Sequence, residues 1–123
     1  MRLHHVLLAI PPGGEASARA FLRDVIGMTE VARPAALAGR VAGWFRLGDL
    51  EIHIAEDAGF VPARKAHPGI EVHDLDGLAG RVSSAGHRVE WDDLLPGRRR
   101  FYTDDPFGNR LEFLGPEKPG RSG

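Results

Sequence analysis

Hydrophobic and polar positions along the chain follow the same order twice. In the first half, apolar runs and one amphipathic stretch predict a strand, a helix and three strands, over residues 3–10, 15–26, 28–33, 41–47 and 50–56. The second half repeats that order over residues 67–73, 75–85, 88–92, 99–103 and 110–114. Gly27 and Gly86 follow the two predicted helices, as is typical of a helix C-terminus. The pattern predicts an α+β fold of two βαβββ modules; the alternative is an α+β sandwich whose spacing repeats by coincidence.

Alternation within the predicted strands divides their residues between two faces. Side chains of a strand point alternately to opposite sides, so the apolar residues of each strand share the face that packs against the helices. The opposite face carries three histidines and a carboxylate: His5, His53, His67 and Glu112. Imidazole nitrogen and carboxylate oxygen bind divalent metals such as Zn, Ni, Mn or Fe(II). These four residues are therefore candidate metal ligands.

Each candidate ligand also has a plainer interpretation. A strand histidine that faces away from the core is commonly exposed to solvent, and His53 could simply lie on an edge strand. Glu112 could form an ion pair on the sheet surface, which would contribute little stability. The remaining histidines, His4, His73 and His87, fall at the ends of predicted elements and are predicted to be structural or exposed.

Composition narrows the classes of function. The chain has 123 residues, a formal net charge of −1 and no cysteine. The absence of cysteine excludes disulfides, cysteine-based zinc modules and thiol catalysis. A charge near zero disfavours binding to nucleic acid, and no apolar run approaches the roughly 20 residues of a membrane span. The N-terminus does not resemble a signal peptide, so a cytoplasmic location is expected.

Three segments carry a family resemblance: residues 3–8, residues 21–28 and residues 102–113, the last of which includes the run Asp-Pro-Phe-Gly-Asn-Arg-Leu-Glu. They resemble the vicinal oxygen chelate superfamily, which contains glyoxalase I, bleomycin resistance proteins, fosfomycin-resistance thiol transferases and extradiol dioxygenases. The resemblance extends over residues 3–114. It implies a single domain at residues 1–114, with modules at about 1–57 and 66–114. Residues 115–123, rich in Gly and Pro, are expected to form a flexible tail.

The resemblance also implies an assembly and a metal site. Such modules curl into a half-open, eight-stranded cup that holds one metal, with ligands from the first and fourth strand of each module. Matched residue by residue, these positions are His5, His53, His67 and Glu112. Single-domain members are commonly homodimers whose subunits share a cup. We therefore expect a homodimer that binds a divalent metal ion and a small-molecule substrate or ligand.

One departure from the family pattern concerns the fourth strand. Glyoxalase I members usually have a glutamate there, whereas this chain has His53, with Glu51 two residues earlier on the same face. His53 or Glu51 is then the candidate catalytic base. The resemblance implies a metal-dependent lyase, thiol transferase or dioxygenase that chelates two neighbouring oxygens of a small substrate. The alternatives are a non-catalytic small-molecule-binding protein that uses the same cup, and a dimer that has lost activity.

Basic and aromatic residues are further candidates for contact with the substrate. Arg64, Lys65 and the arginines at residues 98–100 could hold an anionic group, or could belong to solvated loops. Trp44 and Phe101 could line the cup or pack in the core.

Overall fold

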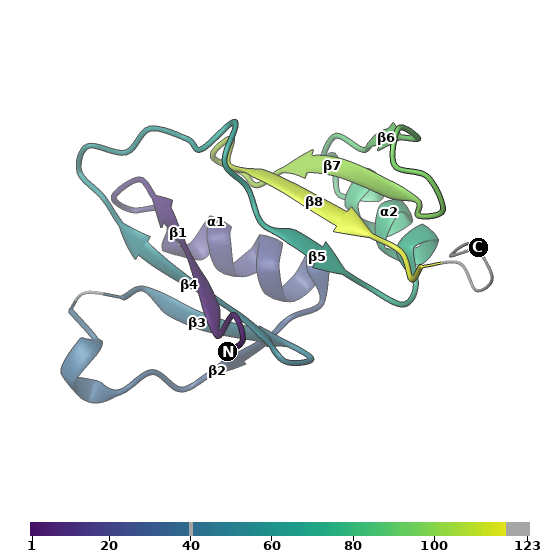
Figure 1. Cartoon of the computed structure of the whole chain (residues 1–123). Helices are drawn as coiled ribbons and strands as arrows, with labels where there is room; N and C mark the ends of the chain where they lie inside the picture. The colour runs from purple at the N-terminus through teal and green to yellow at the C-terminus, as the bar shows by residue number, and fades with distance from the viewer. Residues whose placement is uncertain (40, 118–123) are drawn as a thin grey trace. The chain divides into compact units, whose positions relative to one another are not determined.

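The computed structural model describes residues 1–39 and 41–117 (Figure 1). Its contacts divide the chain into two units, with the boundary after Pro62. Each unit has the order βαβββ and a four-stranded sheet of one parallel and two antiparallel strand pairs. The predicted architecture of two βαβββ modules is thus confirmed. Of the predicted tail, residues 118–123 lie outside the described residues.

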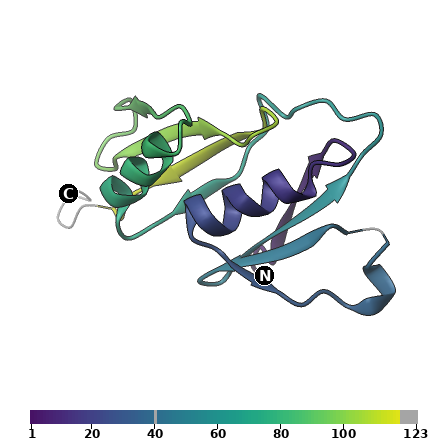
Figure 2. The same cartoon turned by 180° about the vertical axis from the view of Figure 1, so that it is seen from behind.

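A helix lies across one face of the sheet in the first unit (Figure 2). The strands have the order β1-β4-β3-β2. The elements are β1 (His5–Ile10), α1 (Glu15–Arg19), η1 (Ala20–Ile26), β2 (Thr29–Val31), η2 (Ala35–Leu37), β3 (Gly43–Leu47) and β4 (Leu50–Glu56). α1 continues directly into the π-helical segment η1, and together they cover the predicted helix. Gly27 ends η1 with a φ of 91°, a left-handed conformation that is easy only for glycine.

The apolar residues of the first unit form a core between this helix and the sheet. Phe21 and Leu22 of η1 are almost fully buried, as are Phe45 of β3 and Ile52 and Ile54 of β4. The two isoleucines alternate with Glu51 and His53 along β4, so the polar side chains occupy the opposite face. The division into an apolar and a polar face is the one that the strand pattern predicted.

The second unit repeats this arrangement. Its elements are β5 (Gly69–Glu71), α2 (Leu75–Ser84), β6 (Glu90–Asp92), β7 (Arg100–Asp104) and β8 (Arg110–Leu114), and its strand order is β5-β8-β7-β6. Leu78 and Val82 of α2 are buried together with Phe101 and Phe113 of the sheet. Asp74 caps α2, because its Oδ1 accepts a hydrogen bond from the backbone N–H of Gly77 across 3.0 Å.

The run Asp-Pro-Phe-Gly-Asn, at residues 105–109, forms the connection between β7 and β8. The carboxylate of Asp105 accepts hydrogen bonds from the backbone N–H groups of Phe107 and Asn109 and from Nδ2 of Asn109, at 2.8–2.9 Å. Oδ1 of Asn109 in turn accepts from the backbone N–H of Ala63 across 3.0 Å. The backbone N–H of Arg110 donates to the carbonyl of Ala63 across 2.9 Å. This network fixes where β8 begins, and therefore the position of the polar residues that β8 carries.

Five predicted strands are shorter in the structure. Three are in the first unit, where the observed strands are β1, β2 and β3, and two are in the second unit. The strand predicted at residues 67–73 is reduced to β5, so His67 precedes it and His73 follows it. Pro68 has no N–H to donate to a neighbouring strand, which limits β5 on its N-terminal side. The strand predicted at residues 88–92 begins only at Glu90.

Two of the plainer interpretations can now be judged. His53 lies on a central strand and is 5% exposed, so the interpretation as an exposed edge-strand histidine is wrong. Phe101 is fully buried and packs against Phe113 and Trp91, so it belongs to the core.

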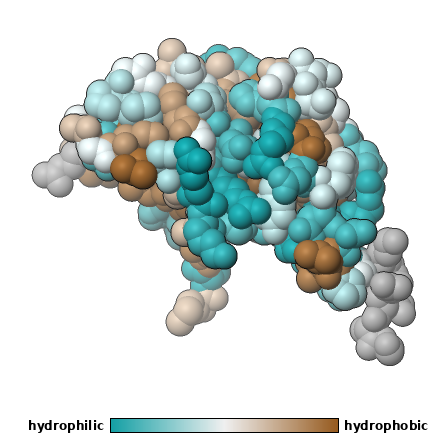
Figure 3. Space-filling view, turned by 90° about the horizontal axis from the view of Figure 1, so that it is seen from above, coloured by the Kyte–Doolittle hydropathy of each residue, from teal (hydrophilic) through white to brown (hydrophobic). Residues whose placement is uncertain are grey.

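The surface in Figure 3 is mainly hydrophilic, and its hydrophobic residues gather in separate patches. Large exposed hydrophobic residues among the described ones are Met1, Leu3, Leu7, Val61, Trp91 and Leu94. Within residues 1–39 and 41–117, no helix has the length and apolar character needed to cross a membrane.

Candidate functional site

Three rings stack on the polar face of the first sheet. His53 of β4 lies between His5 of β1 and Trp44 of β3, because β4 is the strand between them. The centroid of the His53 ring is 4.1 Å from that of His5 and 4.2 Å from that of Trp44. The ring planes are inclined by only 13° and 7°. The stack buries His53 and fixes the orientation of its imidazole.

Glu51 holds the edge of the His53 ring. Nε2 of His53 donates to Oε1 of Glu51 across 3.0 Å, and Nη2 of Arg46 donates to Oε2 of Glu51 across 2.9 Å. These hydrogen bonds lower the pKa of Glu51 to about 2, the bond from His53 contributing most. Glu51 is therefore ionised at neutral pH and is a weak base. With Nε2 donating to Glu51, Nδ1 is the nitrogen of His53 that can accept a proton or bind a metal.

The stacking of His5 on His53 limits how the two can bind a metal together. The lone pair of an imidazole nitrogen lies in the plane of its ring, and the two planes are nearly parallel. Lone pairs in parallel planes do not converge readily on one ion, so this arrangement favours one of the two rings as a ligand over both together. His53, with its edge bound to Glu51, is the more constrained of the two.

The second unit brings together His67 and Glu112. Nε2 of His67 lies 2.9 Å from Oε1 of Glu112, and Glu112 is only 8% exposed. Nδ1 of His67 lies 2.8 Å from the carbonyl oxygen of Lys65. A carbonyl only accepts hydrogen bonds, so Nδ1 must carry a proton and donate it. In neutral His67, the lone pair of Nε2 then faces a carboxylate oxygen, and this contact is favourable only with a proton or a cation between them.

This pair of donor atoms suits a divalent metal ion. Nitrogen and oxygen ligands bound at about 2.1 Å, with an angle near 90°, lie roughly 3 Å apart. The distance between Nε2 of His67 and Oε1 of Glu112 has this value. Metal-binding histidines typically donate their second N–H to a carbonyl or carboxylate, as His67 does to Lys65.

Other side chains support His67 and Glu112 from the same sheet face. The ring of Tyr102 meets that of His67 edge to face, with centroids 5.6 Å apart. Nη1 of Arg100 donates to Oε2 of Glu112 across 3.2 Å, and the same guanidinium contacts Oδ1 of Asp92. Arg100 therefore occupies one oxygen of Glu112 and directs the other toward His67.

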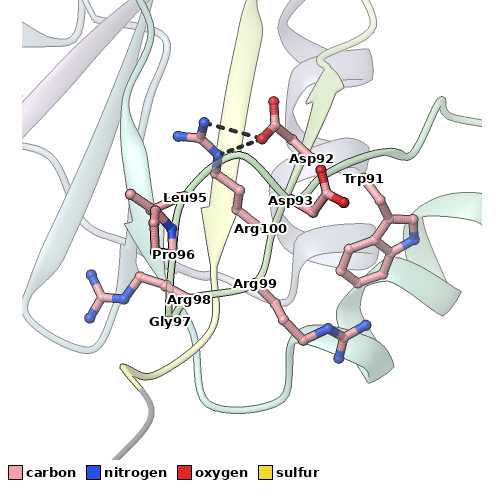
Figure 4. A pocket seen from close by; sticks show the side chains of 9 residues that line it. All are labelled: Trp91, Asp92, Asp93, Leu95, Pro96, Gly97, Arg98, Arg99 and Arg100. Atoms are coloured by element: carbon pink, nitrogen blue, oxygen red, sulfur yellow. Dashed lines mark hydrogen bonds and ion pairs between the residues drawn. The ribbon is translucent and has the colours of Figure 1, made fainter. Parts of the chain in front are cut away.

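The three arginines at residues 98–100 do not act as one cationic cluster. Arg98 pairs with Glu71, Arg99 pairs with Asp76, and Arg100 pairs with Asp92 and Glu112. They line a cavity of about 520 Å³ beneath the loop between β6 and β7, together with Trp91, Asp92, Asp93, Leu95, Pro96 and Gly97 (Figure 4). Through Arg100, this cavity adjoins the carboxylate of Glu112.

The predicted ligands thus form one pair in each unit. His5 and His53 contact each other in the first unit, and His67 and Glu112 do so in the second. Among residues 1–39 and 41–117, no group of three or more histidine, aspartate or glutamate side chains is arranged to hold a metal.

The sequence interpretation overlooked Tyr102 and Arg46. Tyr102 lies directly opposite Glu112 on β7, and Arg46 lies directly opposite Glu51 on β3. Strand alternation together with the register of the sheets places both residues on the polar face, so these two pieces of information would have indicated them.

Comparison with known proteins gives relatives among solved structures. No family model matches the sequence, and no curated protein matches it. A glyoxalase family protein from Bacillus anthracis is 40% identical, with a TM-score of 0.90 over 95% of this chain and 96% of that one. Lactoylglutathione lyase from Agrobacterium tumefaciens is 21% identical, with a TM-score of 0.72 over 93% of this chain and 92% of that one.

A third similar structure contains a metal. It is a variant of the fosfomycin resistance protein FosX from Listeria monocytogenes, in complex with Mn(II) and 1S,2S-dihydroxypropylphosphonic acid. It is 18% identical to this chain, with a TM-score of 0.71 over 91% of this chain and 87% of that one.

Proposed function

This chain belongs to the glyoxalase family, within the vicinal oxygen chelate superfamily, and we propose that it is a metal-dependent enzyme acting on a small oxygen-bearing substrate. His67, Glu112 and His5 are the proposed ligands of a divalent ion. His53 is the proposed base, and Glu51 is the residue that orients it. The reaction could be that of a lyase, a thiol transferase or a dioxygenase, and a screen with substrates of each class would identify it.

The contact between His67 and Glu112 carries this proposal. The proton on Nδ1 of His67 is committed to the carbonyl of Lys65, so Nε2 and Oε1 of Glu112 face each other across 2.9 Å. A divalent cation bound to both atoms would relieve the repulsion between their lone pairs. The neighbouring Arg100 offsets part of the charge of Glu112 and keeps Oε1 turned to His67.

The stacked rings of the first unit support separate roles for His5 and His53. The His53 imidazole is held by Glu51 at Nε2, which leaves Nδ1 to take a proton from the substrate and return it. The bound ion would act as a Lewis acid that polarises two neighbouring substrate oxygens. Ligation by His53 as a fourth residue, which the family resemblance implies, stays a prediction.

Metal content tests the proposal directly. Protein loaded with Mn(II), Zn(II), Ni(II) or Fe(II) and then dialysed should retain about one ion per chain. Glu112→Gln and His67→Ala should lose it, while His73→Ala, an exposed histidine of the same unit, should retain it. His53→Ala should keep the ion but lose activity toward lyase, thiol-transferase and dioxygenase substrates. If wild type retains no metal and His5→Ala leaves ligand binding unchanged, the protein is a non-catalytic binding protein.

Mixing two variants tests whether a dimer shares the site. If each site combines the first unit of one subunit with the second unit of the other, His5→Ala mixed with His67→Ala should recover metal binding and activity. In the mixed dimer, one site would then contain both wild-type residues and the other site neither. No recovery, with both proteins dimeric by light scattering, would show that each site is built within one chain. Homodimer formation and a cytoplasmic location otherwise stay predictions.

A further inference from the structure

A second cavity in the second unit is lined mainly by arginines. It has a volume of about 340 Å³, and its walls are Arg64, Arg88, Asp104, Gly108 and Arg110. Small-ligand sites have typical volumes of roughly 300–1,000 Å³. Neither the proposed metal site nor the proposed base uses any of these residues.

The charges around this cavity do not balance. Asp104 accepts two hydrogen bonds from Nη2 of Arg88 and one from Nε, and Arg88 also contacts Glu90. Within the described part of the chain, neither Arg64 nor Arg110 forms an ion pair with a carboxylate. Two guanidinium groups therefore border the same cavity without an acidic partner of their own.

Comparison of the two units explains why Arg110 lacks such a partner. In the first unit, the charged residue two positions before His53 is Glu51, and its cross-strand neighbour Arg46 neutralises it. In the second unit, the residue two positions before Glu112 is Arg110, and its cross-strand neighbour is Asp104. Here the carboxylate of Asp104 is already engaged by Arg88.

Arg110 is held in place by an aromatic ring rather than by a carboxylate. Its guanidinium lies 4.1 Å from the centroid of Tyr102, a cation–π contact. Its Nε is buried and, among the described residues, has no hydrogen-bond partner. A guanidinium kept in one orientation, with N–H groups to spare, is prepared to bind an oxyanion in a bidentate manner.

Arg64 is carried by an anchored segment. Both backbone groups of Ala63 are bonded, its N–H to Oδ1 of Asn109 and its carbonyl to the N–H of Arg110. Arg64 therefore leaves the backbone directly beside the start of β8. Gly108, which has a φ of 95°, also lines the cavity and has no side chain to fill it.

The cavity adjoins the proposed metal ligands. Arg110 and Glu112 lie on the same face of β8, two residues and so about 7 Å apart along the strand. Tyr102 contacts both the guanidinium of Arg110 and the ring of His67. A small substrate whose oxygens lie at Glu112 and His67 could therefore place a second polar group beside Arg110.

We propose that Arg64 and Arg110 form a binding site for an oxyanion, and that this anion is the carboxylate, phosphate or phosphonate group of the substrate. The second half of this proposal rests on the proposed metal-dependent function, whereas the anion site itself does not. The cavity of Figure 4 is a weaker candidate for the same role, because each of its three arginines already pairs with a carboxylate.

Inorganic phosphate tests the anion site without a metal. In calorimetric titrations with EDTA present, wild type should bind phosphate with a millimolar dissociation constant. Arg110→Met and Arg64→Met should each weaken binding by roughly tenfold, the loss of one charge-assisted contact. Arg23→Met, which removes an exposed arginine of the first unit, should bind phosphate as wild type does. No binding by wild type, or equal binding by the three variants, would overturn the site.

Two further measurements separate the possible failures. Arg110→Lys should bind phosphate more tightly than Arg110→Met, and retention of metal by Arg110→Met would show that this variant is folded. With Mn(II)-loaded protein, 1S,2S-dihydroxypropylphosphonic acid should bind at least tenfold more tightly than propane-1,2-diol, and Arg110→Met should abolish this difference. If phosphate binds but the phosphonate and the diol bind to Mn(II)-loaded protein with equal affinity, the site binds a free anion and the assignment to the substrate is wrong. If phosphate binds and no metal is retained, the anion site stands and the metal-dependent function does not.

Discussion

Replacing Asp105 should destabilise the second unit more than its position in a turn suggests. Asp105→Ala removes a buried carboxylate that accepts hydrogen bonds from the backbone N–H groups of Phe107 and Asn109 and from Nδ2 of Asn109. Hydrogen bonds to a charged group contribute about 1.5–3 kcal/mol each, and burial of the carboxylate offsets part of that sum. We expect a net loss of about 3 kcal/mol in the free energy of unfolding, a large part of the stability of a small protein.

Urea unfolding followed by circular dichroism measures this loss. With a slope of about 1.5–2 kcal/mol per molar urea, the midpoint should fall by about 1.5–2 M. Asp57→Ala is a matched control, because Asp57 accepts a single exposed hydrogen bond from the N–H of Gly59. That control should lose about 1 kcal/mol or less. Similar midpoints for the two variants would refute the idea that the Asp105 network fixes the start of β8.

Asp105 should also change how the free energy of unfolding depends on pH. Burial raises the pKa of Asp105 above its ordinary value of 3.8, although hydrogen bonds from Asn109, Phe107 and Gly108 partly oppose this. Because its pKa is higher in the folded state, Asp105 binds a proton more tightly when the protein is folded, and its protonated form stabilises the fold. This contribution is complete below pH 3.8 and is lost as pH rises through the folded-state pKa. Asp105→Asn has no such group, so its stability relative to wild type should increase with pH across this window. A difference that stays constant with pH would contradict the assignment.

Three further perturbations test other parts of the structure. Glu51→Gln should remove a stabilising contribution that is present above pH 4.5 and lost as pH falls toward 2, seen as a flatter dependence of melting temperature on pH. Leu78→Ala should cost about 2–5 kcal/mol in chemical unfolding, whereas Leu94→Ala, at an exposed position, should leave stability unchanged. Tyr102→Leu should weaken Mn(II) binding by roughly 10- to 100-fold, because the ring of His67 loses its neighbour. Equal metal affinity in wild type and this variant would show that Tyr102 does not position His67.

Strand alternation was enough to predict the polar faces, because period two is a local property of the chain. It correctly separated Glu51 and His53 from the isoleucines of β4. The partners of the polar residues were not predictable in this way. The pairing of His67 with the carbonyl of Lys65 depends on a segment that precedes β5 and belongs to no strand. The division of the arginines among separate carboxylates depends on long side chains that reach across strands.

The register of the sheets reveals a repeat that the sequence alone hides. On β4 and β8, the candidate functional residues His53 and Glu112 lie directly opposite aromatic residues, Trp44 and Tyr102 respectively. Trp44 stacks face to face on His53, which holds the ring flat and buried. Tyr102 instead meets the ring of His67 edge to face and contacts the guanidinium of Arg110, so one aromatic position neighbours both the proposed metal-binding pair and the proposed anion site. Equivalent positions in the two modules thus hold different side chains, an imidazole that is the proposed base in one and a carboxylate that is a proposed metal ligand in the other.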